Sequence, residues 1–322
     1  MTPNLPPWLR SAIEQLVQTY STQDLSVSSA NITHNYRNLK PSNQTIVKDA
    51  DGAAYCASRM PATYAAISAS LAYVLRRLPE FKPITLLDIG AGPGTASFVA
   101  EAQLPSLQSF TLLDDNAPFL NIAKQLMIDA PPPLRQAQIL DSNIIKSTEF
   151  PKSDLILAGY SLVELPVSTQ SSLVQRLWQT CTGVLLIVEP GTPKAYQRLM
   201  VLRDQLIAQG AHVVAPCMGQ GACPLSAPDW CHFSQRLARS RAHMQAKGAH
   251  VPFEDEKFSY LAVSRTQSQM SGFRILAPPK ESKGAIEFKL CADNGLKNRL
   301  IPSRDKQAYK QVRKLGWGDV IA

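Results

Sequence analysis

The sequence predicts an α/β fold in which helices cover both faces of a doubly wound, mostly parallel sheet. From position 84 onward, apolar runs of strand length alternate with amphipathic segments of helix length. The first apolar run ends in Asp88, and three glycines follow within five positions: Gly90, Gly92 and Gly94. The second run ends in another acid, Asp114, 20 residues after Gly94. These features predict a ligand crevice at the carboxyl ends of neighbouring strands.

Residues 1–80 are predicted to be helical. Apolar side chains recur at helical spacing in Pro7–Gln18, where Pro7 is tolerated in the first turn. Ser58–Arg77 predicts a long amphipathic helix that leads to the first strand. Arg59 and Tyr64 on this helix either face a substrate or cover the helix surface.

The α/β pattern assigns each element in turn. The expected strands are Thr85–Ile89, Ser109–Asp114, Gln138–Leu140, Asp154–Tyr160 and Gly183–Glu189. The expected helices between them are Thr95–Leu104, Ala117–Ile128 and Thr169–Cys181, followed by a helix at Lys194–Gly210 that a glycine closes. Three consecutive prolines, Pro131–Pro133, predict a surface loop, because they suit neither a helix nor a central strand.

The glycine loop has the spacing Gly-x-Gly-x-Gly, whereas a nicotinamide-binding loop reads Gly-x-Gly-x-x-Gly. It resembles motif I of the Rossmann-like class I S-adenosylmethionine (SAM)-dependent methyltransferases. The resemblance implies that Asp88 and the glycines hold the cofactor's amino-acid end and that Asp114 holds the ribose hydroxyls. Asp141 and the segment Tyr160–Glu164 end neighbouring strands, so we expect them around the same crevice. Glu164 is interpreted as a structural acid, and no catalytic residue is assigned.

Composition is ordinary, with 322 residues of which 45% are hydrophobic and 18% charged. No apolar run approaches the roughly 20 residues that would span a bilayer. The first residues show neither a charged head with an apolar core nor an Arg- and Ser-rich amphipathic segment. We therefore expect a cytoplasmic protein without a membrane partner, and we assume a monomer.

Three cysteines within fifteen residues, Cys217, Cys223 and Cys231, lie in a loop rich in glycine and proline. Such a loop buries little, and thiolate ligation of a metal would supply folding free energy. The spacings of five and seven residues fit paired zinc knuckles poorly, so an iron–sulfur cluster is favoured and zinc is the alternative. Cys291 is the candidate fourth ligand, and His232 is its rival. The two remaining cysteines are interpreted as buried small side chains.

The net charge of +8 arises in the last fifth of the chain. Residues 257–322 hold 13 lysines and arginines against 5 acids, whereas residues 1–256 hold 20 of each sign. A small antiparallel β unit is expected from Gly272–Leu276 and Gly284–Cys291, followed by a basic helix at Arg304–Lys314. Four basic residues there are three or four apart and can share one face: Lys306, Lys310, Arg313 and Lys314. Such a face suits RNA phosphates, and the alternative is a solubilising tail.

Several motifs from about Tyr55 to the C-terminus occur together. They are Tyr55-x3-Arg59-Met-Pro61, the Asp88–Gly94 loop, Val188-Glu-Pro-Gly191, Cys-x5-Cys-x7-Cys-His, Phe253–Tyr260 and the distal Cys291. This set resembles the methyltransferase-like assembly factors of the small ribosomal subunit, bacterial proteins with mitochondrial relatives. The resemblance implies a SAM-type fold, association with small-subunit rRNA, and a [4Fe–4S] cluster held by Cys217, Cys223, Cys231 and Cys291.

Four regions are therefore expected. They are an N-terminal helical region (1–80), a SAM-binding core (81–214), a cysteine-rich metal-binding insertion (215–256) and a basic C-terminal β unit that binds RNA (257–322). The first functional hypothesis is a SAM-binding, iron–sulfur protein that methylates rRNA or assembles the small ribosomal subunit. The alternative is a small-molecule or protein methyltransferase with a structural zinc site.

Overall fold

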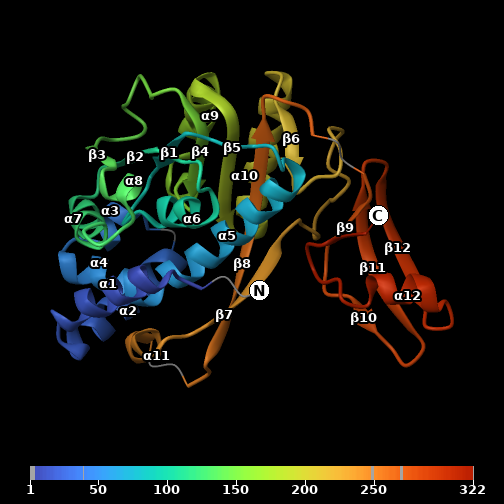
Figure 1. Ribbon diagram of the computed structural model, residues 1–322, viewed down its shortest axis with the longest axis horizontal. Helices are drawn as coiled ribbons and strands as arrows, with labels where there is room; N and C mark the ends of the chain where they lie inside the picture. The colour runs from blue at the N-terminus through green and yellow to red at the C-terminus, as the bar shows by residue number, and fades with distance from the viewer. Residues whose placement is uncertain (1–3, 39, 248–249, 269–270, 322) are drawn as a thin grey trace.

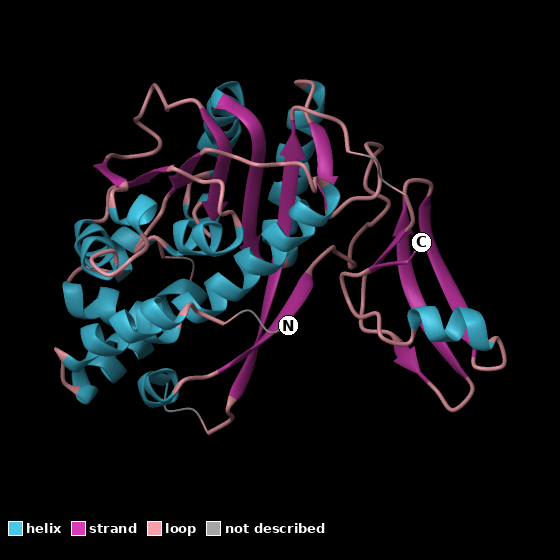
Figure 2. Ribbon diagram, in the orientation of Figure 1, coloured by secondary structure: helices cyan, strands magenta, loops and turns pink. Residues whose placement is uncertain are grey.

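The computed structural model describes residues 4–38, 40–247, 250–268 and 271–321 (Figures 1 and 2). A large α/β part contains the N-terminal helices and the main sheet (Figure 1). A small β unit formed by the last part of the chain stands beside it (Figure 1).

The main sheet has the strand order β3-β2-β1-β4-β5-β8-β6, and β7 pairs with the outer part of β8. Its strands are β1 (Thr85–Ile89), β2 (Ser109–Asp114), β3 (Gln138–Asp141), β4 (Ser153–Gly159), β5 (Cys181–Pro190), β6 (His212–Ala215), β7 (Phe233–Ala238) and β8 (Phe253–Ser264). The strands from β1 to β5 are parallel, whereas β8 is antiparallel to both β5 and β6. This order, with one antiparallel strand inserted before the last parallel strand, is that of the Rossmann-like class I methyltransferase fold. The predicted fold class is confirmed.

Helices cover both faces of this sheet because successive strand side chains point to opposite sides. Leu86, Leu112 and Leu155 pack on one face with α5 (Met60–Arg77), α6 (Thr95–Gln103) and α7 (Ala117–Leu126). On the other face, Leu87 and Ile156 pack with α9 (Val167–Thr180) and α10 (Pro193–Ala208). The glycine loop after β1 lies at the carboxyl edge of the sheet, between these two cores.

The N-terminal region is helical, as predicted. It consists of α1 (Pro7–Gln18), α2 (Thr22–Arg37), α3 (Ser42–Thr45), α4 (Asp49–Ser58) and α5. The helix expected over Ser58–Arg77 begins at Met60, because Ser58 closes α4 and Arg59 lies between the two helices. Pro61 follows in the first turn of α5, where its missing amide hydrogen costs nothing.

The C-terminal unit is a five-stranded antiparallel sheet with its own core. Its elements are β9 (Phe273–Ile275), β10 (Lys280–Glu281), β11 (Ala285–Ala292), β12 (Gly295–Pro302), α12 (Lys306–Val312) and β13 (Val320–Ile321). Ile286, Phe288 and Leu290 of β11 lie on the face that packs against Val312 of α12. The expected β unit and basic helix are therefore present.

Two further expectations about the elements differ from the structure. Pro132 and Pro133 do not lie in a loop but open a one-turn helix, α8 (Pro132–Arg135), whose first positions need no amide donor. The boundary expected at 256/257 falls inside β8, which belongs to the main sheet. The outer half of β8 pairs with β7, and the two strands carry the short helix α11 (Arg241–Lys247) to the N-terminal helices α2 and α4 (Figure 1). We call β7, α11 and the outer half of β8 the arm.

Among the described residues, no helix combines the length and the apolar character needed to cross a membrane.

Candidate functional site

A cavity of about 420 Å³ lies at the carboxyl ends of β1, β2 and β4. The glycine loop forms one wall, and the segment after β2 forms another. The 3₁₀ helix η1 (Leu162–Glu164) and the connection from α2 to α3 close over it. The cavity brings together most of the residues that the sequence predicts for cofactor binding, namely Asp88, Gly90, Gly92 and Asp114. Gly94 is adjacent, at the N-terminus of α6.

The glycine loop needs glycine at all three positions. Gly90, Gly92 and Gly94 have φ values of +63°, +54° and +92°, in the left-handed region that other residues rarely adopt. A Cβ atom on Gly90 would lie 2.4 Å from the Cβ atom of Ser161, so this approach of the loop to the end of β4 also requires glycine. The loop is thereby shaped to leave space above it, and Thr95 and Ala96 at the start of α6 line the cavity.

The two acids predicted at this edge have different partners. Asp88 is buried, and its Oδ2 atom accepts hydrogen bonds from the Ser97 amide (2.9 Å) and hydroxyl (2.8 Å), so it fastens β1 to the first turn of α6. Asp114 accepts from the Gly92 amide at 2.7 Å and from the Asn116 amide at 2.9 Å. Burial raises the pKa of Asp88 to about 7 and that of Asp114 to about 6.

Asp141 lies elsewhere than expected. It pairs with Asp114 in the register of β2 and β3, but its side chain is exposed and does not line the cavity. Asn143, two residues later, lines the cavity and donates a hydrogen bond to Asp115 at 2.5 Å. The chain turns after β3, so the side chain that reaches the crevice follows the strand end instead of lying on it.

A cover over the cavity was not apparent from the sequence. The carboxylate of Glu164 accepts hydrogen bonds from the amide (2.8 Å) and the hydroxyl (2.7 Å) of Ser42, and Tyr36 contacts the same hydroxyl at 2.9 Å. Burial raises the pKa of Glu164 to about 7. Glu164 thus has the structural role that we expected, but its partner lies 122 positions away, where no local pattern indicates it.

Tyr160 follows β4 at the inner end of the cavity. Its φ of 60° is unusual for a residue with a side chain, and such strain tends to occur at functional sites. Its hydroxyl donates to Glu256 of β8 at 2.9 Å, and the guanidinium of Arg59 lies 3.5 Å from the same carboxylate. Tyr64, by contrast, is buried in the core below the sheet.

The four predicted ligand cysteines line a second, small cavity between the loop after β6 and the C-terminal sheet. They are Cys217, Cys223, Cys231 and Cys291. Burial raises the pKa of Cys231 well above its usual value and that of Cys291 to about 11, and neighbouring cysteine side chains add to both shifts. His232, the rival ligand, does not line this cavity but stacks on Trp230 with 4.5 Å between ring centroids. No group of three or more His, Cys, Asp or Glu side chains in the described part of the chain could hold a single metal ion as it stands.

Several contacts fasten the cysteine loop to both parts of the molecule. Arg203 of α10 donates to the carbonyl of Gly221 at 2.6 Å, and Arg274 of β9 donates to that of Pro216 at 3.1 Å. Both guanidinium groups are almost completely buried. Lys289 of β11 forms an ion pair with Asp229 of the loop. The other two cysteines, Cys56 and Cys181, are buried in the α/β part, away from this cavity.

The predicted RNA-binding residues are exposed on the C-terminal unit. Lys306 and Lys310 lie on α12, while Arg313 caps its end and Lys314 follows. Between them, Ala308, Tyr309 and Val312 pack on the core of this unit. The basic side chains are therefore held on the solvent side of a short, anchored helix.

A human protein named "Ribosome assembly protein METTL17, mitochondrial" is 26% identical over 287 residues, which cover 83% of this chain and 61% of the human protein. The "Rsm22-cox11 tandem protein 2, mitochondrial" of Schizosaccharomyces pombe is 24% identical over 83% of this chain and 42% of its own length. The chain thus spans less than two thirds of these relatives.

Solved structures that resemble this one include the plantazolicin methyltransferase BpumL, with a TM-score of 0.42 and 13% identity over 79% of this chain and 98% of that one. Magnesium protoporphyrin IX methyltransferase of Synechocystis has a TM-score of 0.41 and 13% identity over 64% and 80%. The family model described as "Mitochondrial small ribosomal subunit Rsm22" matches residues 49–322, most of the chain. The chain belongs to the Rsm22 family.

Proposed function

We propose that this chain binds SAM in the cavity above the glycine loop and acts in the assembly of a small ribosomal subunit, which it contacts through rRNA. The observation that carries the first part is the hydrogen bond from Gly92 to Asp114, which joins the glycine loop to the acid at the end of β2. The family match and the human relative named as a ribosome assembly protein support the second part.

The cavity suits this cofactor in size and chemistry. Small-molecule sites commonly enclose about 300–1,000 Å³, and this one measures about 420 Å³. The Asp114 carboxylate can accept hydrogen bonds from vicinal ribose hydroxyls, and the acids around the cavity favour a cationic sulfonium. The apolar side chains of Phe119 and Ile144 line the cavity and can pack against a purine ring.

Calorimetric titration with SAM tests this assignment. The wild-type chain should bind SAM, and Asp114→Asn should weaken the affinity by roughly 10- to 100-fold, because the amide offers one acceptor where the carboxylate offers two. Asp141→Asn is the matched control, since Asp141 is exposed outside the cavity, and it should bind like the wild type. Wild-type protein that does not bind SAM would overturn the proposal.

Methyl transfer is the second candidate function. Tyr160 and Ser161 lie where β4 ends and line the cavity, the position from which a SAM enzyme of this fold reaches its acceptor. SAM supplies an electrophilic methyl group when bound, and the chain's contribution would be to position the acceptor. Transfer of labelled methyl groups from SAM to small-subunit rRNA would favour the enzyme; SAM binding without transfer would favour an assembly factor.

We propose further that Cys217, Cys223, Cys231 and Cys291 hold a [4Fe–4S] cluster. Four thiols around one cavity are the donor set that such a cluster takes. A single tetrahedral zinc would need four sulfurs roughly 3.8 Å from one another, given zinc–sulfur bonds of about 2.3 Å. A cluster would instead be held by Cys217, Cys223, Cys231 and Cys291 at a wider spacing than one metal ion needs. Colourless, zinc-loaded protein from anaerobic purification would overturn this assignment.

The cluster's proposed role is structural. Three of the thiols come from the loop after β6, and the fourth comes from β11 of the C-terminal unit. A group bound to all four would join the basic unit to the α/β part. Exposed basic residues on α12 would then be presented to RNA phosphates in a fixed orientation.

A further inference from the structure

The charges around the SAM cavity are unequally distributed. Among the described residues that line it, four are acids, namely Asp88, Asp114, Asp115 and Glu164, and two are lysines or arginines, Lys40 and Arg59. Lys40 is exposed on the connection that covers the cavity, whereas the Arg59 side chain is 26% exposed. The amino-acid end of SAM carries a carboxylate, which the acids would repel and which needs a cation. Arg59 is the better-buried candidate.

Arg59 has donors to spare. Among the described residues, its guanidinium makes one polar contact, the ion pair with Glu256 at 3.5 Å, which is too long for a good hydrogen bond. A guanidinium carries five N–H donors in a fork that matches a carboxylate. Arg59 lines the cavity, where an anionic ligand group would satisfy its remaining donors.

The position of Arg59 matches the expected direction of the ligand. Arg59, Thr63 and Ile67 are successive turns of the α4–α5 segment, and all three line the cavity. Ile67 reaches the end of β4, where a Cβ atom on Gly159 would lie 2.6 Å from its Cδ1 atom. In the sheet, β4 is two strands from β2, or roughly 10 Å. A ribose held at Asp114 thus leaves the amino-acid end directed toward Arg59.

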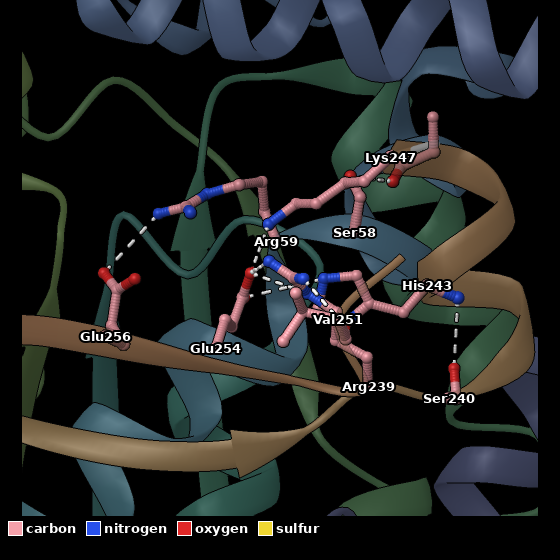
Figure 3. Close-up of polar contacts among 10 residues, drawn as sticks. Ser58, Arg59, Arg239, Ser240, His243, Lys247, Val251, Glu254 and Glu256 are labelled. Carbon is pink, nitrogen blue, oxygen red and sulfur yellow. Dashed lines mark hydrogen bonds and ion pairs between the residues drawn. The ribbon is translucent and has the colours of Figure 1, made fainter. Parts of the chain in front are cut away.

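The arm holds Arg59's partner in place (Figure 3). Glu256 and Glu254 lie on the same face of β8, two residues apart. Glu254 binds Arg239 at 2.9 Å and Lys247 at 2.8 Å, and so ties α11 to β8. The guanidinium of Arg59 points away from this cluster and toward Glu256 (Figure 3).

We propose that Arg59 binds the carboxylate of the cofactor's amino-acid end and that Glu256 is a positioning residue that orients the guanidinium. The proposal rests on SAM binding in this cavity. It also gives the arm a direct contact with the cofactor site, since Glu256 belongs to β8 and accepts the hydrogen bond of Tyr160.

Comparison of SAM with decarboxylated SAM, which lacks only the carboxylate, tests this assignment by calorimetry. The wild type should bind SAM at least tenfold more tightly than the decarboxylated analogue. Arg59→Gln should lose that preference, weakening SAM binding by at least tenfold and analogue binding by less than threefold. Arg59→Lys, which keeps the charge but not the fork, should show an intermediate preference.

Two controls keep the outcomes distinct. Arg37→Gln removes an exposed guanidinium of α2 that does not line the cavity, and Lys40→Gln removes the other cation; both should keep the wild-type preference. A wild type that binds both ligands equally, or a preference lost only in Lys40→Gln, would overturn the role of Arg59 while leaving SAM binding intact. A wild type that binds neither ligand would overturn the proposed function and this inference with it.

Discussion

The cofactor cavity is formed by segments that meet at one edge of one sheet, whereas the four cysteines come from two units with separate cores. In the cavity, every key carboxylate already has partners: Asp88 has Ser97, Asp114 has Gly92, and Glu164 has Ser42. Burial and neighbouring cysteine side chains raise the pKa values of Cys217, Cys231 and Cys291, and contacts of the surrounding loop hold the site in place. This difference suggests that the fold alone forms the SAM cavity. The cysteine site, by contrast, would join the α/β part to the C-terminal unit through the group that it binds.

The largest effect is expected from Cys291→Ser. This change removes the only proposed ligand from the C-terminal unit, so iron should fall from about four per chain to below one. The unit should also become more sensitive to limited proteolysis, because the connection through the bound group is lost and only the contacts of Arg274 and Lys289 with the loop remain. Cys181→Ala, a buried cysteine of the other core, should cost about 1 kcal/mol and retain the iron. If Cys291→Ser kept its full iron content, the proposal that the cysteine site joins the two units through a bound cluster would be contradicted.

Gly90→Ala should damage the SAM cavity without affecting the cysteine site. The positive φ and the 2.4 Å approach to Ser161 together predict a loss of about 2–4 kcal/mol in the free energy of unfolding, measured with urea. Gly284→Ala, where a Cβ meets nothing within 4 Å, should change it by less than about 0.5 kcal/mol. Equal stabilities of the two variants would show that the glycine loop is not constrained in this way.

A smaller effect concerns the dependence of stability on pH. The pKa of Asp88 is raised from 3.8 to about 7 in the folded state, so the protonated form is favoured by folding. Its stabilising contribution is complete below about pH 4 and is lost as the pH rises to about 7. Asp88→Asn keeps an acceptor for Ser97 and should stabilise the protein by up to about 4 kcal/mol at pH 8, with little change at pH 4. If Asp88→Asn and the wild type showed the same dependence of stability on pH, the raised pKa of Asp88 would be contradicted.

The smallest effect on stability is expected at the basic helix. Lys310→Gln with Lys314→Gln should leave the melting temperature unchanged, since both side chains are exposed. The affinity for RNA should fall, and the slope of log affinity against log salt should become shallower by roughly two. Lys124→Gln with Lys152→Gln, two exposed lysines of the α/β part, is the control. If both double variants showed the same slope of log affinity against log salt, the basic residues at α12 would belong to a solubilising tail.

Much of the fold could be predicted because its determinants are local. The glycine loop, the acids at strand ends and the alternation of strands and helices all occur within short windows. The place of the long strand β8 in the main sheet does not follow from its local sequence, because its pairing with β5 joins segments about 70 residues apart. The loop predicted at Pro132 is wrong, because proline is tolerated at the start of a helix.

The candidate sites were predictable to different degrees. The four proposed ligands are all cysteines, so their convergence on one cavity could be proposed from their spacing in the sequence and from the family resemblance. The cover formed by Ser42 on Glu164 and the contact of Arg59 with Glu256 depend on chain segments that only the tertiary fold brings together. Asp141 was placed in the crevice because it ends a strand, but the turn after β3 presents Asn143 there.

The most direct test of the account is cross-linking of the chain to RNA in cells, with SAM binding and iron measured on the same purified material. We expect enrichment of small-subunit rRNA, cross-links at residues of the C-terminal unit, and about four irons per chain. Cys291→Ser should lose the iron and the rRNA enrichment together while SAM binding persists. Cross-links to no rRNA, from protein that binds SAM and carries iron, would contradict the proposed role in subunit assembly.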